Sequence, residues 1–371
     1  MHACAADLAT AGLPAQAVQA RAADWIGQVR AQDRAPTPLD AFMREYDLSS
    51  REGVLLMCLA EALLRIPDAA TAERLIADKL GSGAWQRHLG HSASFWVNAS
   101  TWWLLLTGRL VRREAGGGSD VIEALRHATG RLGEPAIRLA LRQAMRLMAE
   151  QFVMGRDIEL ALRRAATRPH ERHSFDMLGE AALTAADARR YRQAYLHAID
   201  AIGRSGDPQA PITARPGISI KLSALHPRYE IAQQQRVQRE LAPVLLELAG
   251  AAASARLCLT VDAEEADRLE LSLDLIEAVF SDSGLPPWDG FGVAVQACQM
   301  RALPLIDWLA ALAQDRGRVL QVRLVKGAYW DTEIKRAQEQ GLPGYPVFTR
   351  KSRTDVHYLA CARRLLDARP G

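Results

Sequence analysis

The stretch GISIKLSAL, residues 217–225, alternates apolar and polar side chains directly after Pro216. A two-residue period is that of a β-strand, in which neighbouring side chains point to opposite sides. Further strand-like runs follow at 257–262, 291–296 and 320–325. Amphipathic helical stretches lie after the four runs, at about 231–253, 265–280, 302–313 and 354–366. Strict alternation of strand and helix predicts βα units around a parallel sheet.

The choice between an open doubly wound sheet and a closed barrel depends on the two sides of these runs. One side of each run is apolar: Ile218, Ile220, Leu222; Leu257, Leu259, Val261; Phe291, Val293, Val295; Leu320, Val322, Leu324. The other side carries serine, lysine, aspartate, glutamine and arginine. A doubly wound sheet should be apolar on both sides, whereas the inward side of a barrel can be polar where it opens into an active site. The pattern predicts the first half of a (β/α)8 barrel, about four βα units.

The residues before the barrel show a helical period from about Ala15 to His197. Ser49 and Glu52 form a capping-box pattern before one of these helices. We therefore expect an α/β protein with an N-terminal helical domain. Its expected organisation is an N-terminal arm at 1–38, a helical domain at 39–170, a linker and barrel-entry helix at 171–216, and the half barrel at 217–371.

Charge and cysteine content limit the partners and the compartment. The chain has 46 basic and 43 acidic residues, a net charge of +3, so no field that would gather nucleic acid is expected, and nucleic acid is not predicted as a partner. The five cysteines are scattered without CxxC spacing, which is typical of reduced thiols. No apolar run reaches the roughly 18 residues of a membrane span. These features predict a cytoplasmic protein.

Four polar residues share the inward side of the four runs: Lys221, Asp262, Gln296 and Arg323. Two cations, a carboxylate and an amide would thus converge on one cavity. Burying such charges is costly unless they pair with each other or meet a charged ligand. The pattern favours a ligand site, and the alternative is a structural ion-pair network inside the barrel.

The segment after the fourth run suits a flat cofactor. KGAYW, residues 326–330, has two small residues that let a ligand approach the backbone and two aromatic faces. Thr349, Arg350 and Lys351 place a hydroxyl and two cations before a helix, which suits a pyrophosphate, although such a triplet can also be a solvated helix start. His88 and His91 have no acidic or thiol partner nearby, so no metal is assigned.

Several long motifs resemble one family. GISIKLSALHPRY (217–229), DAEEADRLE (262–270), RLVKGAYWD (323–331) and GYPVFTRK (344–351) are similar to the proline dehydrogenase barrel of the bifunctional proline utilization A enzymes. Upstream, MCLAEALLRIP (57–67) and SFDMLGEAA (174–182) are similar to their helical domain and linker. The resemblance runs from about Leu39 to the end of the chain.

The resemblance implies oxidation of L-proline to Δ1-pyrroline-5-carboxylate in a distorted barrel, with FAD as electron acceptor and quinone reoxidising the flavin at the periphery of the inner membrane. It implies that Lys221 binds the proline carboxylate, Asp262 organises the polar site and Tyr329 flanks the substrate. Arg323 is expected to hydrogen-bond the flavin near N5. The expected FAD-binding residues are Asp262, Ala263, Gln296, Arg323, Val325, Lys326, Gly327, Ala328, Trp330, Thr349, Arg350 and Lys351.

Two departures from the family pattern shape the expectations. The segment before Leu39 has no basic strand, so the ribbon-helix-helix DNA-binding domain of the larger members is not expected. A barrel of eight units needs about 250 residues, and about 155 follow Gly217. We therefore expect a fragment that alone binds FAD poorly and does not oxidise proline. The alternative is a non-catalytic or assembly module whose half barrel is completed by another chain. Exposed strand edges can also pair with a second copy of the chain, which would give a homo-oligomer.

Overall fold

The computed structural model describes residues 15–31, 153–207 and 209–368. The chain divides into two compact units, residues 1–26 with 157–371, and residues 27–156. Helix α2 (Ala15–Ala31) lies in the segment expected to be an N-terminal arm. The helices expected between residues 49 and 153 and the His88–His91 pair lie outside the described residues.

The sheet of the larger unit has five parallel strands in the order β1-β2-β3-β4-β5. They are β1 (Ser174–Asp176), β2 (Gly217–Ile220), β3 (Leu259–Val261), β4 (Phe291–Gln296) and β5 (Gln321–Val325). The four predicted runs are confirmed as β2 to β5. The prediction missed β1, which pairs with β2 inside the segment 171–216 that we expected to hold only a linker and a helix. The sheet therefore begins one strand earlier than predicted.

A helix follows each strand, as the alternation predicts. The helices are α9 (Ile158–Ala166), α10 (Ala185–Ser205), α11 (Gln234–Ser254), α12 (Leu269–Phe280), α13 (Ala302–Arg316), α14 (Trp330–Glu339) and α15 (Lys351–Asp367). Helix α10 is the expected barrel-entry helix, and it begins at a capping box between Thr184 and Asp187. Helix α14, directly after β5, was not predicted. The first predicted run is shorter than expected because residues 222–224 form a 3-10 turn, η2 (Leu222–Ala224).

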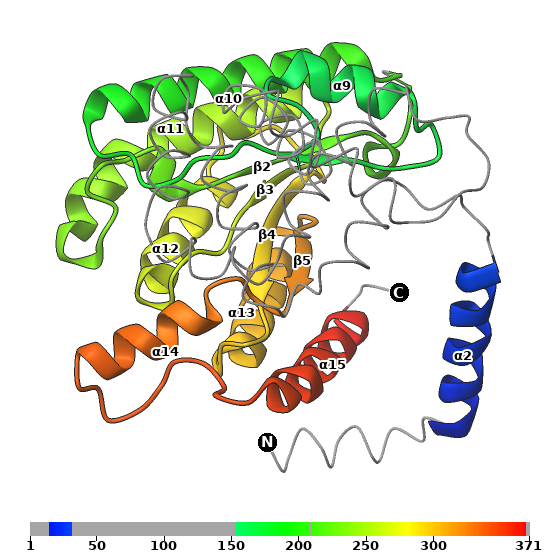
Figure 1. The fold of residues 1–371 in the computed structure, drawn as a ribbon. Coiled ribbons are helices and arrows are strands. Elements are labelled where there is room, and N and C mark those ends of the chain that lie inside the picture. The colour runs from blue at the N-terminus through cyan, green and yellow to red at the C-terminus, as the bar shows by residue number, and fades with distance from the viewer. Residues whose placement is uncertain (1–14, 32–152, 208, 369–371) are drawn as a thin grey trace, which may run out of the picture. The chain divides into compact units, whose positions relative to one another are not determined.

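The strand order distinguishes the two sheet architectures. A doubly wound sheet reverses its strand order at a switch point, whereas here the order is sequential throughout. Right-handed crossovers between sequential parallel strands put all connecting helices on one side, and Figure 1 shows the strands as a fan with α10, α11, α12 and α13 around it. The order is that of consecutive units of a (β/α)8 barrel, which confirms the predicted architecture.

The core lies between the strands and these helices. The outward side chains Ile218, Leu259 and Phe291 are at most 1% exposed, so the apolar side of the first three runs faces the helices as predicted, while the residues of β5 are only half-buried. At the amino end of β2, the guanidinium of Arg215 donates to the carbonyls of Gly203, Ala255 and Arg256 at 3.0, 2.9 and 3.2 Å. This buried arginine joins the carboxyl ends of α10 and α11. The opposite, polar side of the strands bears the candidate site.

Among the described helices, none has both the length and the apolar character that a membrane crossing requires.

Candidate active site

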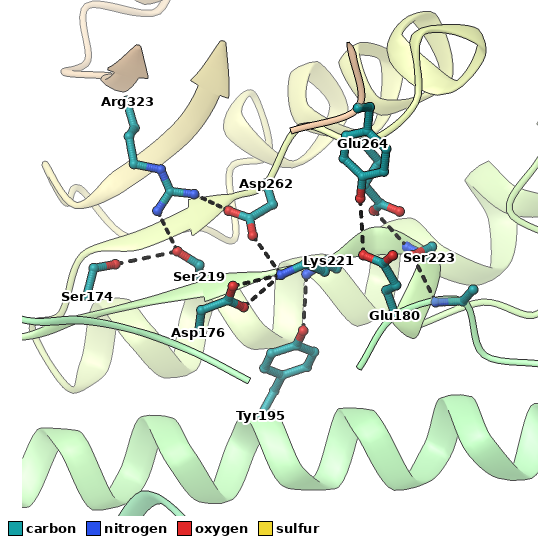
Figure 2. Close-up of polar contacts among 12 residues, drawn as sticks. Ser174, Asp176, Glu180, Tyr195, Ser219, Lys221, Ser223, Asp262, Glu264 and Arg323 are labelled. Carbon is teal, nitrogen blue, oxygen red and sulfur yellow. Dashed lines mark hydrogen bonds and ion pairs between the residues drawn. The ribbon is translucent and has the colours of Figure 1, made fainter. Parts of the chain in front are cut away.

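Three of the predicted site residues lie together on the inward side of the sheet (Figure 2). Lys221 follows β2, Asp262 follows β3, and Arg323 lies in the middle of β5. The ammonium of Lys221 donates to Asp262 Oδ2 at 3.0 Å, and Arg323 Nη2 donates to Asp262 Oδ1. Asp262, whose side chain is 11% exposed, therefore bridges both cations.

A second carboxylate, which the sequence did not reveal, completes the cluster. Asp176, the last residue of β1, accepts from Lys221 Nζ at 2.7 and 2.9 Å. The ammonium thus lies within hydrogen-bond distance of two carboxylates, those of Asp176 and Asp262. The signal that could have found Asp176 is the polar-apolar-polar alternation of Ser174-Phe175-Asp176, which β1 shows as exposed, buried, exposed.

The acid partners decide the protonation of Lys221. Burial by itself would lower the pKa of this ammonium, but the carboxylates of Asp176 and Asp262 raise it above the ordinary lysine value. The side chain therefore stays a cation in neutral and mildly alkaline solution.

Serine side chains hold Arg323 from the opposite side. Arg323 Nη1 donates to Ser219 Oγ at 2.7 Å, and Ser219 lies 3.4 Å from Ser174 Oγ. The guanidinium is still 40% exposed at its side chain. It is therefore oriented by Asp262 and Ser219 and also open to a ligand.

Tyr329, which we expect to flank the substrate, contacts the loop after β1. Its hydroxyl donates to Glu180 Oε2 at 3.1 Å, and Glu180 lies in the loop after β1. Burial and the neighbouring Glu180 carboxylate raise the pKa of Tyr329 above the ordinary tyrosine value, so the phenol stays neutral. In the sequence, Glu180 belongs to the linker motif, and no role in the site is predicted for it.

The loops after successive strands are tied together by buried hydrogen bonds. Glu264 accepts the backbone N–H of Ser223 at 3.0 Å and pairs with Arg268 at 3.1 Å. Ser223 Oγ in turn accepts the N–H of Ala181 at 3.1 Å. Burial raises the pKa of the Glu264 carboxyl. These contacts hold the loops after β1, β2 and β3 in one arrangement, which Figure 2 shows.

Gln296, at the end of β4, and Gly327, in the loop after β5, pack against each other beside the cluster and form one wall of the site. The Gln296 side chain donates from Nε2 to the carbonyl of Glu264 at 2.8 Å, while its Oε1 is buried with no hydrogen-bond partner in the part of the chain that the structure describes. Gly327 has φ of +119°, and a Cβ on it would overlap with Cys298 Sγ and lie 2.9 Å from Gln296 Oε1. The buried acceptor of Gln296 and the backbone of Gly327 are thus packed directly against each other and against Cys298, and the positive φ suits only glycine here.

The remaining predicted cofactor residues lie around the loop after β5 and the start of α15. Lys326 and Lys351 both donate to Asp355, at 2.5 Å and at 2.8 Å, so the structure brings these two cations together. Trp330 Nε1 donates to the carbonyl of Phe348 at 2.5 Å, which joins the two segments. Val325 ends β5, Ala263 follows Asp262, and Ala328, Thr349 and Arg350 are exposed. Among the described residues, no group of three or more His, Cys, Asp or Glu is arranged to hold a metal.

Comparison with known proteins bears on this arrangement. A family model described as "Proline dehydrogenase" matches residues 161–371, which include every strand of the sheet. A second, described as "DNA-binding domain of Proline dehydrogenase", matches residues 38–152. That description runs counter to our expectation of no nucleic-acid partner, and its matched residues lie outside the part that the structure describes.

Curated relatives and solved structures agree with the first match. The chain is 54% identical over 330 residues to the bifunctional protein PutA of Salmonella typhimurium and 49% identical over 324 residues to that of Rhizobium meliloti. These alignments cover 88% and 86% of this chain but 25% and 26% of the relatives, so the chain spans about a quarter of their length.

Two crystal structures illustrate the structural likeness. A mutant of proline utilization A from Bradyrhizobium japonicum has a TM-score of 0.62 and 52% identity, over 92% of this chain and 34% of that one. Proline utilization A from Bdellovibrio bacteriovorus, inactivated by N-propargylglycine, has a TM-score of 0.57 and 26% identity, over 68% and 27%. Since the first family model covers more than half of the sequence and the whole of the described sheet, the chain belongs to the proline dehydrogenase family.

Proposed function

We propose that the protein oxidises L-proline to Δ1-pyrroline-5-carboxylate with FAD as the electron acceptor. The observation that carries the proposal is the cluster of Lys221 and Asp262, at the carboxyl ends of β2 and β3, with Arg323 of β5, in a chain of the proline dehydrogenase family. In a (β/α)8 barrel this end of the strands is where active sites lie.

The cluster suits a substrate that carries a carboxylate. Lys221 offers a cation whose ammonium is paired with both Asp176 and Asp262. Asp176 is the more exposed of these two carboxylates, with 45% of its side chain exposed against 11% for Asp262. A proline carboxylate would take the place of Asp176 on the ammonium, while Asp262 keeps Lys221 in position.

The residues beside the cluster fit FAD. The buried Gln296 Oε1 has no partner among the described residues and can accept from an N–H of the ring. Gly327, whose φ is +119° and whose Cβ position is filled by Cys298 and Gln296, sets the backbone course of the loop after β5 next to this acceptor. Lys326 and Lys351 would bind the pyrophosphate, and Trp330 would flank the ring.

FAD, when bound, would supply the acceptor for the hydride that leaves C5 of proline, and the proline nitrogen would lose its proton to solvent as the C=N bond forms. The protein orients the reactants and places charge. Arg323, held by Asp262 and Ser219, presents a fixed cation that stabilises negative charge developing on the ring. Tyr329, held neutral beside Glu180, flanks the substrate and helps exclude water.

The reduced flavin must pass its electrons to a second acceptor. Quinone is the acceptor that we propose for the reduced flavin, and its place in the membrane would bring the protein to the membrane periphery. The assignment of quinone rests on the family resemblance of the motifs alone. The site residues described above support proline and FAD and do not bear on the electron acceptor.

The direct test is to assay the purified 371-residue protein with L-proline and an artificial electron acceptor, beside the full product of the gene that encodes it. FAD content is read from the flavin absorbance band, and D-proline serves as the control substrate. We expect L-proline oxidation and a flavin spectrum from the full gene product. Absence of proline-dependent flavin reduction there would refute the proposed function. Comparable turnover from both proteins would show that the five described strands suffice, against our expectation that 371 residues bind FAD poorly.

A further inference from the structure

Tyr195 is a fully buried tyrosine of α10 that lies directly beneath the cluster. None of its surface is exposed. Its hydroxyl oxygen accepts the backbone N–H of Lys221 at 3.1 Å, and Figure 2 shows the ring extending from α10 toward the end of β2. The contact joins a helix of the outer layer to the residue that we assign to the substrate carboxylate.

The strand pairing explains why this N–H needs a partner from a side chain. The last residue pair between β1 and β2 is Asp176 with Ser219, and β2 ends at Ile220. Lys221 comes next, with φ of −109° and ψ of 125°, and precedes the 3-10 turn η2. Its N–H therefore lies beyond the end of the β1–β2 ladder. A buried N–H without an acceptor is costly, and the phenol oxygen supplies that acceptor.

Lys221 is in this way held at both ends. Tyr195 fixes the peptide from which the side chain departs, while Asp176 and Asp262 hold the ammonium at 2.7 and 3.0 Å. A lysine side chain has four rotatable bonds, so the position of its ammonium depends on a fixed starting point as well as on its partners. Binding of a ligand carboxylate changes the partners, and the backbone contact then remains to define the reach of Lys221.

The phenol is suited to this role because it stays neutral. Burial raises the pKa of Tyr195 above the ordinary tyrosine value, with Asp176 and Asp262 adding to the effect. The oxygen therefore remains an uncharged acceptor and adds no anion beside the two carboxylates.

We propose that Tyr195 is a positioning residue of the active site, which fixes through the Lys221 backbone the ammonium that binds the substrate carboxylate. This inference rests on the proposed function. It assigns no chemical step to Tyr195, which acts only through Lys221.

The test is the variant Tyr195→Phe in the full gene product, which keeps the ring and removes only the acceptor. The matched control is Tyr229→Phe, because Tyr229 is also buried, at 4% exposure, and its hydroxyl interacts with Ser272 of α12. We expect Tyr195→Phe to raise the KM for proline, and the dissociation constant of the ring carboxylate tetrahydro-2-furoate, by about three- to tenfold. We expect kcat to change by less than about twofold, and the flavin content to stay unchanged.

Amide hydrogen exchange gives a second reading that does not depend on catalysis. Exchange of the Lys221 amide should be faster in Tyr195→Phe than in the parent or in Tyr229→Phe. Suppose that the parent oxidises proline and binds the analogue, but Tyr195→Phe leaves both KM and amide exchange unchanged. This result would overturn the role of Tyr195 and leave the proposed function standing. A parent that does neither would refute the proposed function, and the inference would fall with it. A fall in kcat with unchanged KM would also overturn it.

Discussion

Replacing Asp176 by asparagine should strengthen the binding of a carboxylate ligand, because Asp176 and the ligand compete for the same ammonium. Lys221 Nζ lies 2.7 and 2.9 Å from the two oxygens of Asp176 and 3.0 Å from Asp262. Asp176 is the more exposed of the two carboxylates on the ammonium, so we expect a ligand carboxylate to displace this contact.

The exposure of the partners sets the magnitude. Asp176 is 45% exposed at its side chain, and an ion pair this exposed contributes about 0.5 to 1 kcal/mol. A charge-assisted hydrogen bond to the ligand contributes about 1.5 to 3 kcal/mol. The net gain from Lys221 is then about 0.5 to 2.5 kcal/mol, so Lys221→Ala should weaken ligand binding by about 2- to 70-fold. Asp176→Asn should strengthen it by about two- to fivefold.

A double-mutant cycle on the full gene product measures both effects. Tetrahydro-2-furoate is titrated against the parent, Asp176→Asn, Lys221→Ala and the double variant, with the flavin spectrum as the signal. Asp200→Asn controls for the change in net charge, since Asp200 pairs with Arg204 on the exposed side of α10. Lys221→Ala should cost more in the Asp176→Asn background than in the parent. Weaker binding by Asp176→Asn, or an equal cost in both backgrounds, would refute the competition.

Three further predictions concern the cofactor side of the site. Arg323→Met should slow the reduction of the flavin by proline in stopped-flow measurements more than it weakens proline binding, and an unchanged rate would remove Arg323 from the site. Gly327→Ala should abolish the flavin absorbance of the purified protein, because a Cβ there would overlap with Cys298 Sγ and φ is +119°; a normal flavin content would contradict the assignment of this wall. Burial raises the pKa of the Cys298 thiol to about 11, so folded protein at pH 8 should resist iodoacetamide at Cys298 until urea is added, as read by peptide mass spectrometry. Equal labelling rates with and without urea would show that the thiol is accessible.

The sequence predicted the strands that carry the main cluster because a two-residue period reports directly which side chains share a face. Lys221, Asp262 and Arg323 could be brought together without knowing any distance, since the carboxyl ends of parallel strands meet at one edge of the sheet. The same reasoning missed Asp176, because β1 has three residues, too few for an alternation to stand out.

Hydrophobic periodicity in the sequence could not predict which helix residue contacts which strand end. The helical period of α10 shows which face is apolar, and Tyr195 belongs to that face. That its hydroxyl lies 3.1 Å from the N–H of Lys221, 26 residues later in the sequence, depends on the packing angle of α10 on β2. The pairing of Tyr329 with Glu180, 149 residues apart, has the same origin, because long-range partners are decided by tertiary packing.

Arg215 lies at the amino end of β2, whereas Lys221 follows the carboxyl end of the same strand. The three carbonyls that Arg215 holds belong to the ends of α10 and α11 and to the turn after α11. A single strand therefore separates a residue that stabilises the scaffold from a residue that we assign to the substrate. Selection can alter the melting temperature through substitutions at the first end and substrate preference through substitutions at the second. Variants of the two kinds should combine additively, so that a stabilised scaffold can accept new chemistry at its loops.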